Sequence, residues 1–150
     1  MIFDHDGTLV DTTGLERLLY PGIRELLESI YKMGIPMFIW TARSQKSTCE
    51  IVASLGVEKF FQDICGGDTT ARKPSVEGLE YLVPEASSES VVIIGDSIGD
   101  MLGAKAYGAF AIAALWSHAE KDISKLMLDN GADKVVRTVK EVEQFILEHI

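Results

Sequence analysis

The chain has 150 residues, of which 47% are hydrophobic and 25% are charged, a composition typical of one folded domain and not of a disordered chain. Its 14 lysines and arginines against 23 aspartates and glutamates give a net charge of −9, which disfavours an extended nucleic-acid ligand. Cys49 and Cys65 form no disulfide framework or zinc motif. With no membrane-length apolar run and no cleavable leader pattern, we expect a single cytoplasmic domain over residues 1–150.

Short apolar runs alternate with amphipathic stretches along the chain. The runs predict strands at residues 1–4, 37–40, 63–66, 91–94, 110–115 and 135–136, and residues 7–14 are turn-rich. Helices are predicted from Ile23 to Gly34, around 48–55, after Pro74, from the fourth strand to Gly108, at 123–128 and at 139–146. Strands that alternate with helices predict an α/β fold with a mainly parallel sheet that is covered on both faces.

Polar side chains follow the ends of several predicted strands. In chain order they are Asp4 and Asp6, Thr41, Lys73 in a loop, and then Asp96 and Asp100. Ligands of an open parallel sheet bind outside the carboxyl ends of its strands, so we expect these side chains to meet at one edge. Clustered carboxylates repel each other and favour a divalent cation, and a site with oxygen ligands alone favours Mg²⁺. Mg²⁺ in turn usually bridges to a phosphate.

The segments Asp4-His5-Asp6-Gly7-Thr8-Leu9-Val10, Thr41, Lys73-Pro74 and Gly95-Asp96-Ser97-Ile98-Gly99-Asp100 occur in this order. They resemble the four motifs of the haloacid dehalogenase-like phosphohydrolase superfamily. The resemblance covers residues 1 to about 116. It implies a Rossmann-like, three-layer core and Mg²⁺-dependent phosphatase activity through an aspartyl-phosphate intermediate.

The resemblance also implies a role for each position. Asp4 is the expected nucleophile, Asp6 the general acid and base, and Lys73 the cation that compensates the carboxylates and the phosphate. The expected Mg²⁺ ligands are Asp4, Asp6 (through its backbone carbonyl), Asp96 and Asp100. The expected substrate-binding set, built on the Thr41 hydroxyl and a neighbouring amide, is Thr41, Ala42, Arg43 and Lys73.

Several of these residues also have a purely structural interpretation. Asp6 could form an Asx-turn into Gly7, and Thr41 could cap the helix that starts near Ser44. Lys73 could be an ordinary solvated lysine. Asp100 completes an S-x-x-D capping box that begins at Ser97.

Three further residues are weaker candidates. We predict that His5 is buried and structural, because strand alternation turns it away from Asp4. Trp116 and His118, like Arg43, follow strand ends and could border the substrate entrance, although residues 117–120 also read as a capping box.

The spacing of the motifs leaves no room for a cap domain, either between Val10 and Ile23 or between Lys73 and Gly95. We therefore expect an open site. Such a site suits a phosphorylated macromolecule, or a phosphorylated small molecule if a second copy of the chain covers the opening in a homo-oligomer. Only three residues precede Asp4, so the first strand is expected to be short.

Two other classes of protein share parts of this pattern. A receiver domain of signalling systems also places paired acids, a threonine and a Lys-Pro pair on a parallel sheet. In a receiver, however, Lys-Pro follows the last site strand, whereas here Gly95-Asp96 follows Lys73. A non-catalytic binding module with a phosphatase fold is the second alternative, and the intact set of Asp4, Asp6, Lys73 and Asp96 argues against it.

Overall fold

The computed structural model describes residues 1–150, and a six-stranded sheet lies at its centre. All neighbouring strands of this sheet are parallel, in the order β5-β4-β1-β6-β7-β8. The strands are β1 (Ile2–Phe3), β4 (Phe38–Trp40), β5 (Asp63–Cys65), β6 (Val92–Gly95), β7 (Phe110–Ala114) and β8 (Lys134–Val136). The short first strand thus lies between β4 and β6, and the predicted parallel α/β sheet is confirmed.

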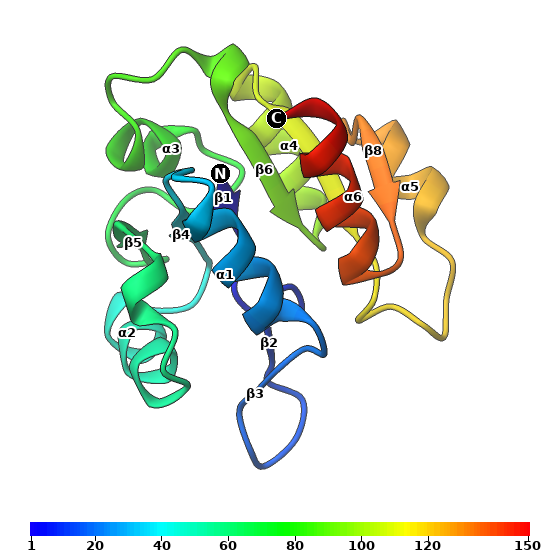
Figure 1. Cartoon of the computed structure of the whole chain (residues 1–150). Helices are drawn as coiled ribbons and strands as arrows, with labels where there is room; N and C mark the ends of the chain where they lie inside the picture. Colours follow the sequence, from blue (N-terminus) through cyan, green and yellow to red (C-terminus); the bar gives the residue numbers. More distant parts are fainter.

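Helices cover both faces of the sheet and complete a Rossmann-like, three-layer sandwich (Figure 1). One face carries α1 (Ile23–Lys32), α2 (Gln45–Ser54) and α6 (Val139–His149), and Figure 1 shows α1 and α6 side by side in front of the strands. The other face carries α3 (Glu77–Leu82), α4 (Ile98–Tyr107) and α5 (Ser124–Asp129). Two short 3₁₀ helices, η1 (Glu58–Phe60) and η2 (Ser88–Ser90), lie in connections.

Side chains of the central strands alternate between two apolar cores. Phe3, Ile39 and Ile94 pack with α1, α2 and α6, whereas Ile2 and Ile93 pack with α3, α4 and α5. Because both faces are buried, these strands read as continuous apolar runs, which is why the sequence predicts them correctly. Full burial of each such side chain contributes roughly 1.5–3 kcal/mol to folding.

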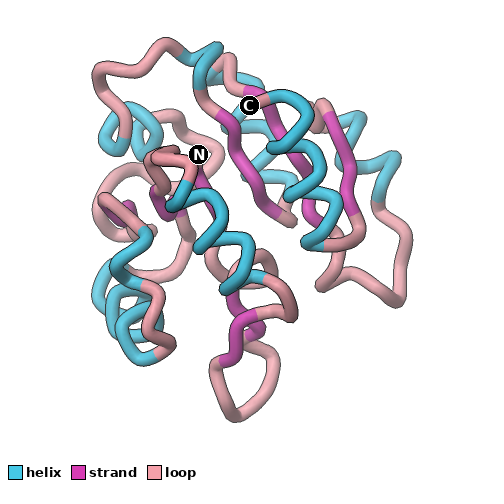
Figure 2. Tube along the Cα trace, in the orientation of Figure 1, coloured by secondary structure: helices cyan, strands magenta, loops and turns pink.

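The segment between β1 and α1 differs from the prediction. The turn-rich stretch leads into β2 (Val10–Asp11) and β3 (Leu18–Leu19), which pair antiparallel in a separate hairpin. This hairpin projects from the body of the molecule (Figure 2). Val10–Asp11 and Leu18–Leu19 form no apolar run like those of the central sheet, so the sequence pattern did not predict them. The hairpin fills the first possible cap position, and α3 and η2 fill the second, so neither interval holds a cap.

The predicted helix ends agree with the backbone. Gly34, Gly56, Gly108 and Gly131 follow α1, α2, α4 and α5 and adopt φ angles of 72°, 69°, 93° and 110°. In this left-handed region glycine carries no steric penalty. None of the helices combines the length and the apolar character that are needed to cross a bilayer.

Candidate active site

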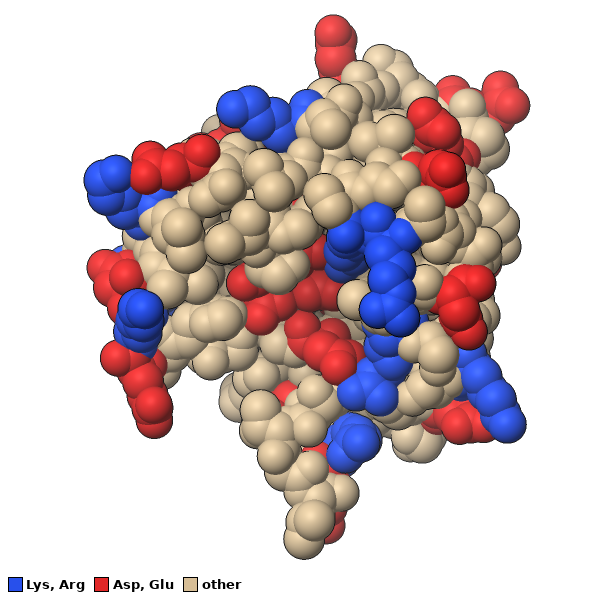
Figure 3. All heavy atoms as spheres, turned by 180° about the vertical axis from the view of Figure 1, so that it is seen from behind, with Lys and Arg blue, Asp and Glu red and all other residues tan.

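Three aspartates meet at the carboxyl edge of the sheet. Asp4 directly follows β1, Asp96 directly follows β6, and Asp100 lies in the first turn of α4. One carboxylate oxygen from each lies within 4.8 Å of the other two. Asp4 and Asp100 are buried, with 8% and 0% of their surface exposed. The space-filling view shows acidic side chains gathered in a hollow in the middle of one face, with lysine and arginine side chains beside them (Figure 3).

Lys73 supplies the positive charge inside this cluster. Its Nζ donates a hydrogen bond to Asp4 Oδ1 at 3.0 Å and a second one to Asp100 Oδ1. Only 8% of the lysine side chain is exposed, so the interpretation of Lys73 as a solvated lysine is wrong. Burial opposes the charge on Lys73, but Asp4 and Asp100 raise the pKa of its ammonium group. Lys73 therefore stays positively charged at neutral pH.

The cluster retains an excess of negative charge. Burial and the neighbouring Asp100 raise the pKa of Asp4 well above its usual value, although Lys73 acts in the opposite direction. Three carboxylates with oxygens close to one another face a single ammonium group. Such a set of oxygen donors fits a small divalent cation. The loop after Asp4 packs tightly against the Asp96 carboxylate, since a Cβ at Gly7 would lie only 2.3 Å from Asp96 Oδ2. The donor set is thus chemically suited to Mg²⁺.

Asp100 uses its two carboxylate oxygens for different partners. Oδ1 accepts from Lys73, whereas Oδ2 accepts from the backbone N–H and the hydroxyl of Ser97 at 3.0 and 2.8 Å. The second set of contacts completes the capping box at the start of α4. The helix-cap interpretation of Asp100 and its place in the aspartate cluster therefore hold together.

Asp6 points toward Arg43 and not into the three-aspartate cluster. Arg43 Nη2 donates to Asp6 Oδ2 at 2.8 Å, Arg43 Nε donates to Oδ1 at 2.9 Å, and His5 Nδ1 lies 2.5 Å from Oδ1. Burial alone would raise the pKa of Asp6, but hydrogen bonds from His5 and Arg43 and their charges lower it well below its usual range. The carboxylate makes no Asx-turn bond, so that alternative is wrong, and only the backbone carbonyl of Asp6 remains as a donor to a metal ion.

His5 is fully buried, as predicted, and its Nε2 has no hydrogen-bond partner. The contact of its other ring nitrogen with Asp6 was not predicted, because alternation along a strand places neighbouring side chains on opposite faces. The chain leaves the strand at Asp4, however, so this rule does not extend to the pair His5–Asp6.

The residues after β4 form the neighbouring wall. Thr41 is buried, and its hydroxyl accepts the backbone N–H of Arg43 at 3.1 Å. The cap of α2 is Ser44, which accepts from the Ser47 N–H, so the interpretation of Thr41 as the helix cap is wrong. Ala42 is exposed between Thr41 and Arg43. The Arg43 guanidinium donates to Asp6 and to the hydroxyl of Ser47, and its side chain is partly exposed.

The loop between β7 and α5 orients Asp96. His118 Nε2 lies 3.0 Å from Asp96 Oδ2, and the hydroxyls of Ser117 and Thr8 lie 3.4 and 3.3 Å from the same carboxylate. Residues 117–120 start no helix, because α5 begins only at Ser124, so the capping-box interpretation there is wrong. The contacts of Thr8 and Ser117 with Asp96 were not predicted, although Thr8 belongs to the loop after Asp4 and Ser117 lies shortly after the end of β7.

Trp40 forms the floor beneath Lys73. The lysine ammonium lies 4.6 Å from the centre of the indole ring, a geometry in which the ring quadrupole attracts the cation. The indole fits between α3 and α4 because both helices carry a glycine there. A Cβ at Gly78 or Gly103 would lie 2.3 or 2.4 Å from an atom of the indole.

We expect Gly103→Ala to lower the free energy of unfolding by about 1–3 kcal/mol, because the added methyl group forces the Trp40 ring out of place. The sign is diagnostic, since alanine ordinarily stabilises a helix interior by roughly 0.5–1 kcal/mol relative to glycine. Urea unfolding measures the change. Gly14→Ala is the control, because no atom lies within 4 Å of a Cβ at that position. A Gly103→Ala protein as stable as the wild type would contradict the close packing described for Trp40.

This arrangement defines a class. At the carboxyl edge of a Rossmann-like sheet, the buried Asp4 that follows the central strand is accompanied by Lys73, by two further aspartates and by the buried Thr41. Residues 14–114 match the haloacid dehalogenase-like hydrolase family, and the chain belongs to this family. The match begins after the loop of Asp4 and Asp6, so the assignment of those two residues depends on the geometry of the site. Family membership also excludes the receiver domain.

Curated relatives carry one recurrent name. The chain is 32% identical over 107 residues to a phosphoglycolate phosphatase of Vibrio parahaemolyticus, which covers 68% of this chain and 47% of that protein. It is also 32% identical over 127 residues to a phosphoglycolate phosphatase of Chromobacterium violaceum, over 83% of this chain and 54% of that protein. The chain thus spans about half the length of the curated relatives it matches.

Solved structures of similar size share the fold. A proposed β-phosphoglucomutase of Thermotoga maritima superposes with a TM-score of 0.89 at 21% identity, over 99% of this chain and 98% of that one. A haloacid dehalogenase-superfamily hydrolase of Ehrlichia chaffeensis superposes with a TM-score of 0.79 at 19% identity, over 98% and 95%. At these identities the likeness concerns the fold alone.

Proposed function

We propose that residues 1–150 form one uncapped domain that hydrolyses phosphomonoesters with the help of Mg²⁺, through an aspartyl-phosphate on Asp4. The observation that carries this proposal is the position of Asp4: it directly follows the central strand β1, accepts a hydrogen bond from Lys73 and has a carboxylate oxygen within 4.8 Å of one from each of Asp96 and Asp100. Family membership and the names of the curated relatives support it.

Asp4 attacks the phosphorus atom with a carboxylate oxygen. Lys73, whose ammonium group lies over the Trp40 ring, offsets part of the negative charge of the cluster by donating hydrogen bonds to Asp4 and Asp100. Thr41, with the backbone at Ala42 and Arg43, binds phosphoryl oxygens beside the nucleophile. Exposure of less than a tenth of Asp4 and Lys73 limits the access of water to these charges and so strengthens their interactions.

The metal ligands in this proposal are the carboxylates of Asp4 and Asp96 and the backbone carbonyl of Asp6, with Asp100 beside them. Bound Mg²⁺ supplies positive charge that polarises the phosphoryl group and offsets its repulsion by the carboxylates. Thr8, Ser117 and His118 hold the Asp96 carboxylate in place for that task.

Asp6 moves protons at the leaving group. Its carboxyl group protonates the departing oxygen when Asp4 is phosphorylated, and its carboxylate later takes a proton from the water that hydrolyses the intermediate. In the present arrangement Asp6 is an anion held by Arg43, the form required of the base. Protonation of the leaving group requires that Asp6 give up this ion pair.

The substrates in this proposal are phosphorylated small molecules, and phosphoglycolate is the first to test because the curated relatives carry that name. A phosphorylated macromolecule also fits an uncapped site, and a homo-oligomer would let a neighbouring copy cover it. Hydrolysis of small phosphates by a protein that light scattering shows to be monomeric would exclude the need for such a cover.

Metal removal is the first test of this function. We expect EDTA to abolish hydrolysis of an aryl phosphate and added Mg²⁺ to restore it, because the clustered carboxylates need the cation before they accept a phosphate dianion. Asp96→Asn should weaken Mg²⁺ binding by about tenfold or more in a calorimetric titration. Asp129→Asn, at an exposed aspartate of α5, is the control. Full activity in EDTA would contradict the proposal.

A further inference from the structure

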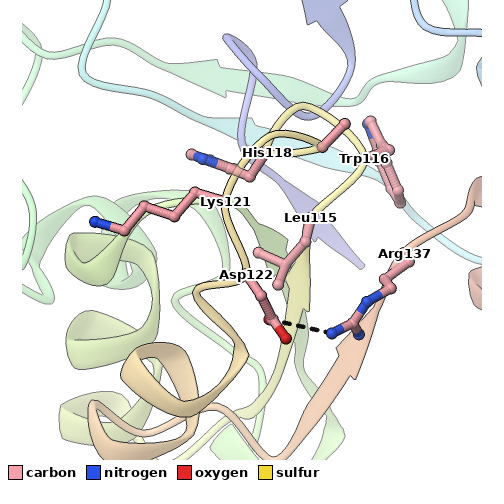
Figure 4. A pocket seen from close by; sticks show the side chains of 7 residues that line it. Leu115, Trp116, His118, Lys121, Asp122 and Arg137 are labelled. Carbon is pink, nitrogen blue, oxygen red and sulfur yellow. Dashed lines mark hydrogen bonds and ion pairs between the residues drawn. The ribbon is translucent and has the colours of Figure 1, made fainter.

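A second pocket opens next to the aspartate cluster, between the carboxyl ends of β7 and β8 (Figure 4). Its volume is about 270 Å³, enough for a small organic molecule. Six of its lining residues are Leu115, Trp116, His118, Lys121, Asp122 and Arg137.

Two contacts fix this pocket against the candidate active site. The Trp116 indole N–H donates to the backbone carbonyl of Thr8 at 3.0 Å, and His118 Nε2 lies 3.0 Å from Asp96 Oδ2. The first contact joins the pocket wall to the loop after Asp4, and the second joins it to a carboxylate of the cluster. The pocket is therefore contiguous with the loops that carry the aspartate cluster.

The pocket carries unsatisfied positive charge. No hydrogen bond or ion pair engages the Lys121 ammonium group, which is exposed. Arg137 Nη2 donates to Asp122 at 3.1 Å and to Ser124, which orients the guanidinium and leaves its other N–H groups without partners. Figure 4 shows that His118 and Lys121 extend to the same side of the loop. The pocket lining thus carries two permanent cations, Lys121 and Arg137, and one carboxylate, Asp122.

This local charge opposes that of the whole chain, whose net charge is −9. A substrate with a second negative group beyond its phosphate is repelled by the protein as a whole and by the aspartates in particular. Cations beside the reaction centre offset that repulsion where it matters, while Leu115 and Trp116 offer apolar surface to a short carbon chain.

We propose that this pocket is a subsite for a second anionic group carried by the organic part of the ester. The preferred substrates are then small organic phosphates that also carry a carboxylate or another phosphate. This inference rests on the proposed phosphatase function. Lys121 is its principal specificity-determining residue, because its charge has no partner in the protein.

Phosphoglycolate and ethyl phosphate make a matched pair of substrates, since they differ chiefly by a carboxylate in place of a methyl group. We expect Lys121→Ala to lower kcat/KM for phosphoglycolate about fivefold to tenfold and to change it less than about twofold for ethyl phosphate. Comparing each variant with the wild type on the same substrate cancels the difference between the two leaving groups. Lys121→Glu should lower the phosphoglycolate value further, and added salt should reduce the wild-type preference.

Lys125→Ala is the matched control, because Lys125 is an exposed lysine of α5 that pairs with Asp129 outside the pocket. It should leave both substrates unaffected. A glycerol bisphosphate tested against glycerol phosphate distinguishes a phosphate from a carboxylate as the preferred second anion.

Equal effects of Lys121→Ala on phosphoglycolate and ethyl phosphate, or no effect on either, would overturn the subsite. Failure of the proposed function looks different, because neither these esters nor an aryl phosphate would be hydrolysed. In that case the protein leaves the esters intact, and calorimetric titration of the wild type still tests the subsite: phosphoglycolate should bind more tightly than ethyl phosphate, and Lys121→Ala should remove the difference.

Discussion

Asp4→Asn is expected to lower the rate of phosphate-ester hydrolysis by about 10³-fold or more, because the amide cannot act as the nucleophile. The substitution should leave the fold intact. Burial and Asp100 raise the pKa of Asp4, so its ionised form is unfavourable in the folded protein and a neutral group of the same shape is tolerated. The melting temperature of Asp4→Asn should therefore equal or exceed that of the wild type without metal.

Steady-state hydrolysis of an aryl phosphate and a thermal unfolding scan measure these two effects on the same preparation. Asp129→Asn, which removes an exposed carboxylate far from the cluster in the chain, should change neither the rate nor the melting temperature appreciably. Wild-type activity in Asp4→Asn would sink the proposed mechanism, whereas loss of folding would show that the Lys73 contact stabilises the chain more than expected.

Asp6→Asn should lower the rate by about 10² to 10⁴-fold for an alkyl phosphate, because its departing oxygen needs a proton. In the phosphorylation step the loss should be much smaller for an aryl phosphate, whose leaving group departs as an anion. Single-turnover measurements on both substrates separate this step from hydrolysis of the intermediate.

Arg43→Lys is a useful companion to Asp6→Asn. It keeps a cation beside Asp6 but removes the paired contacts of the guanidinium with both carboxylate oxygens. We expect a smaller loss than for Asp6→Asn, with the same dependence on the leaving group. Losses in Asp6→Asn that are equal for aryl and alkyl phosphates would argue that Asp6 only shapes the loop.

The fold could be predicted because its local signals agree with its global arrangement. Runs such as 37–40 and 91–94 are apolar throughout because Ile39 and Ile94 pack on one face of the sheet while Ile93 packs on the other. Gly108 and Gly131 mark helix ends because their backbone requires positive φ. The hairpin of β2 and β3 lacked such signals, since neither strand belongs to an apolar run that is buried on both faces of the central sheet.

Part of the candidate site followed from the same logic. Asp4 and Asp96 follow parallel strands, whose carboxyl ends share one edge of the sheet, so their meeting at that edge could be predicted from the sequence. The ion pair between Asp6 and Arg43 could not, because it depends on how two loops fold over the sheet edge. The packing of the Trp40 indole could not be predicted either, since it requires Gly78 and Gly103 from two different helices to lie against the same ring.

Trapping the intermediate tests the central claim most directly. The Asp6→Asn protein, mixed with Mg²⁺ and an aryl phosphate, should form the phosphorylated species readily and hydrolyse it slowly, because the base for the attacking water is missing. Acid quench and borohydride reduction would convert an aspartyl-phosphate to homoserine, and peptide mass spectrometry would locate it. The account predicts homoserine at position 4; unmodified Asp4 in a protein that still turns over, or a label on any other residue, would contradict it.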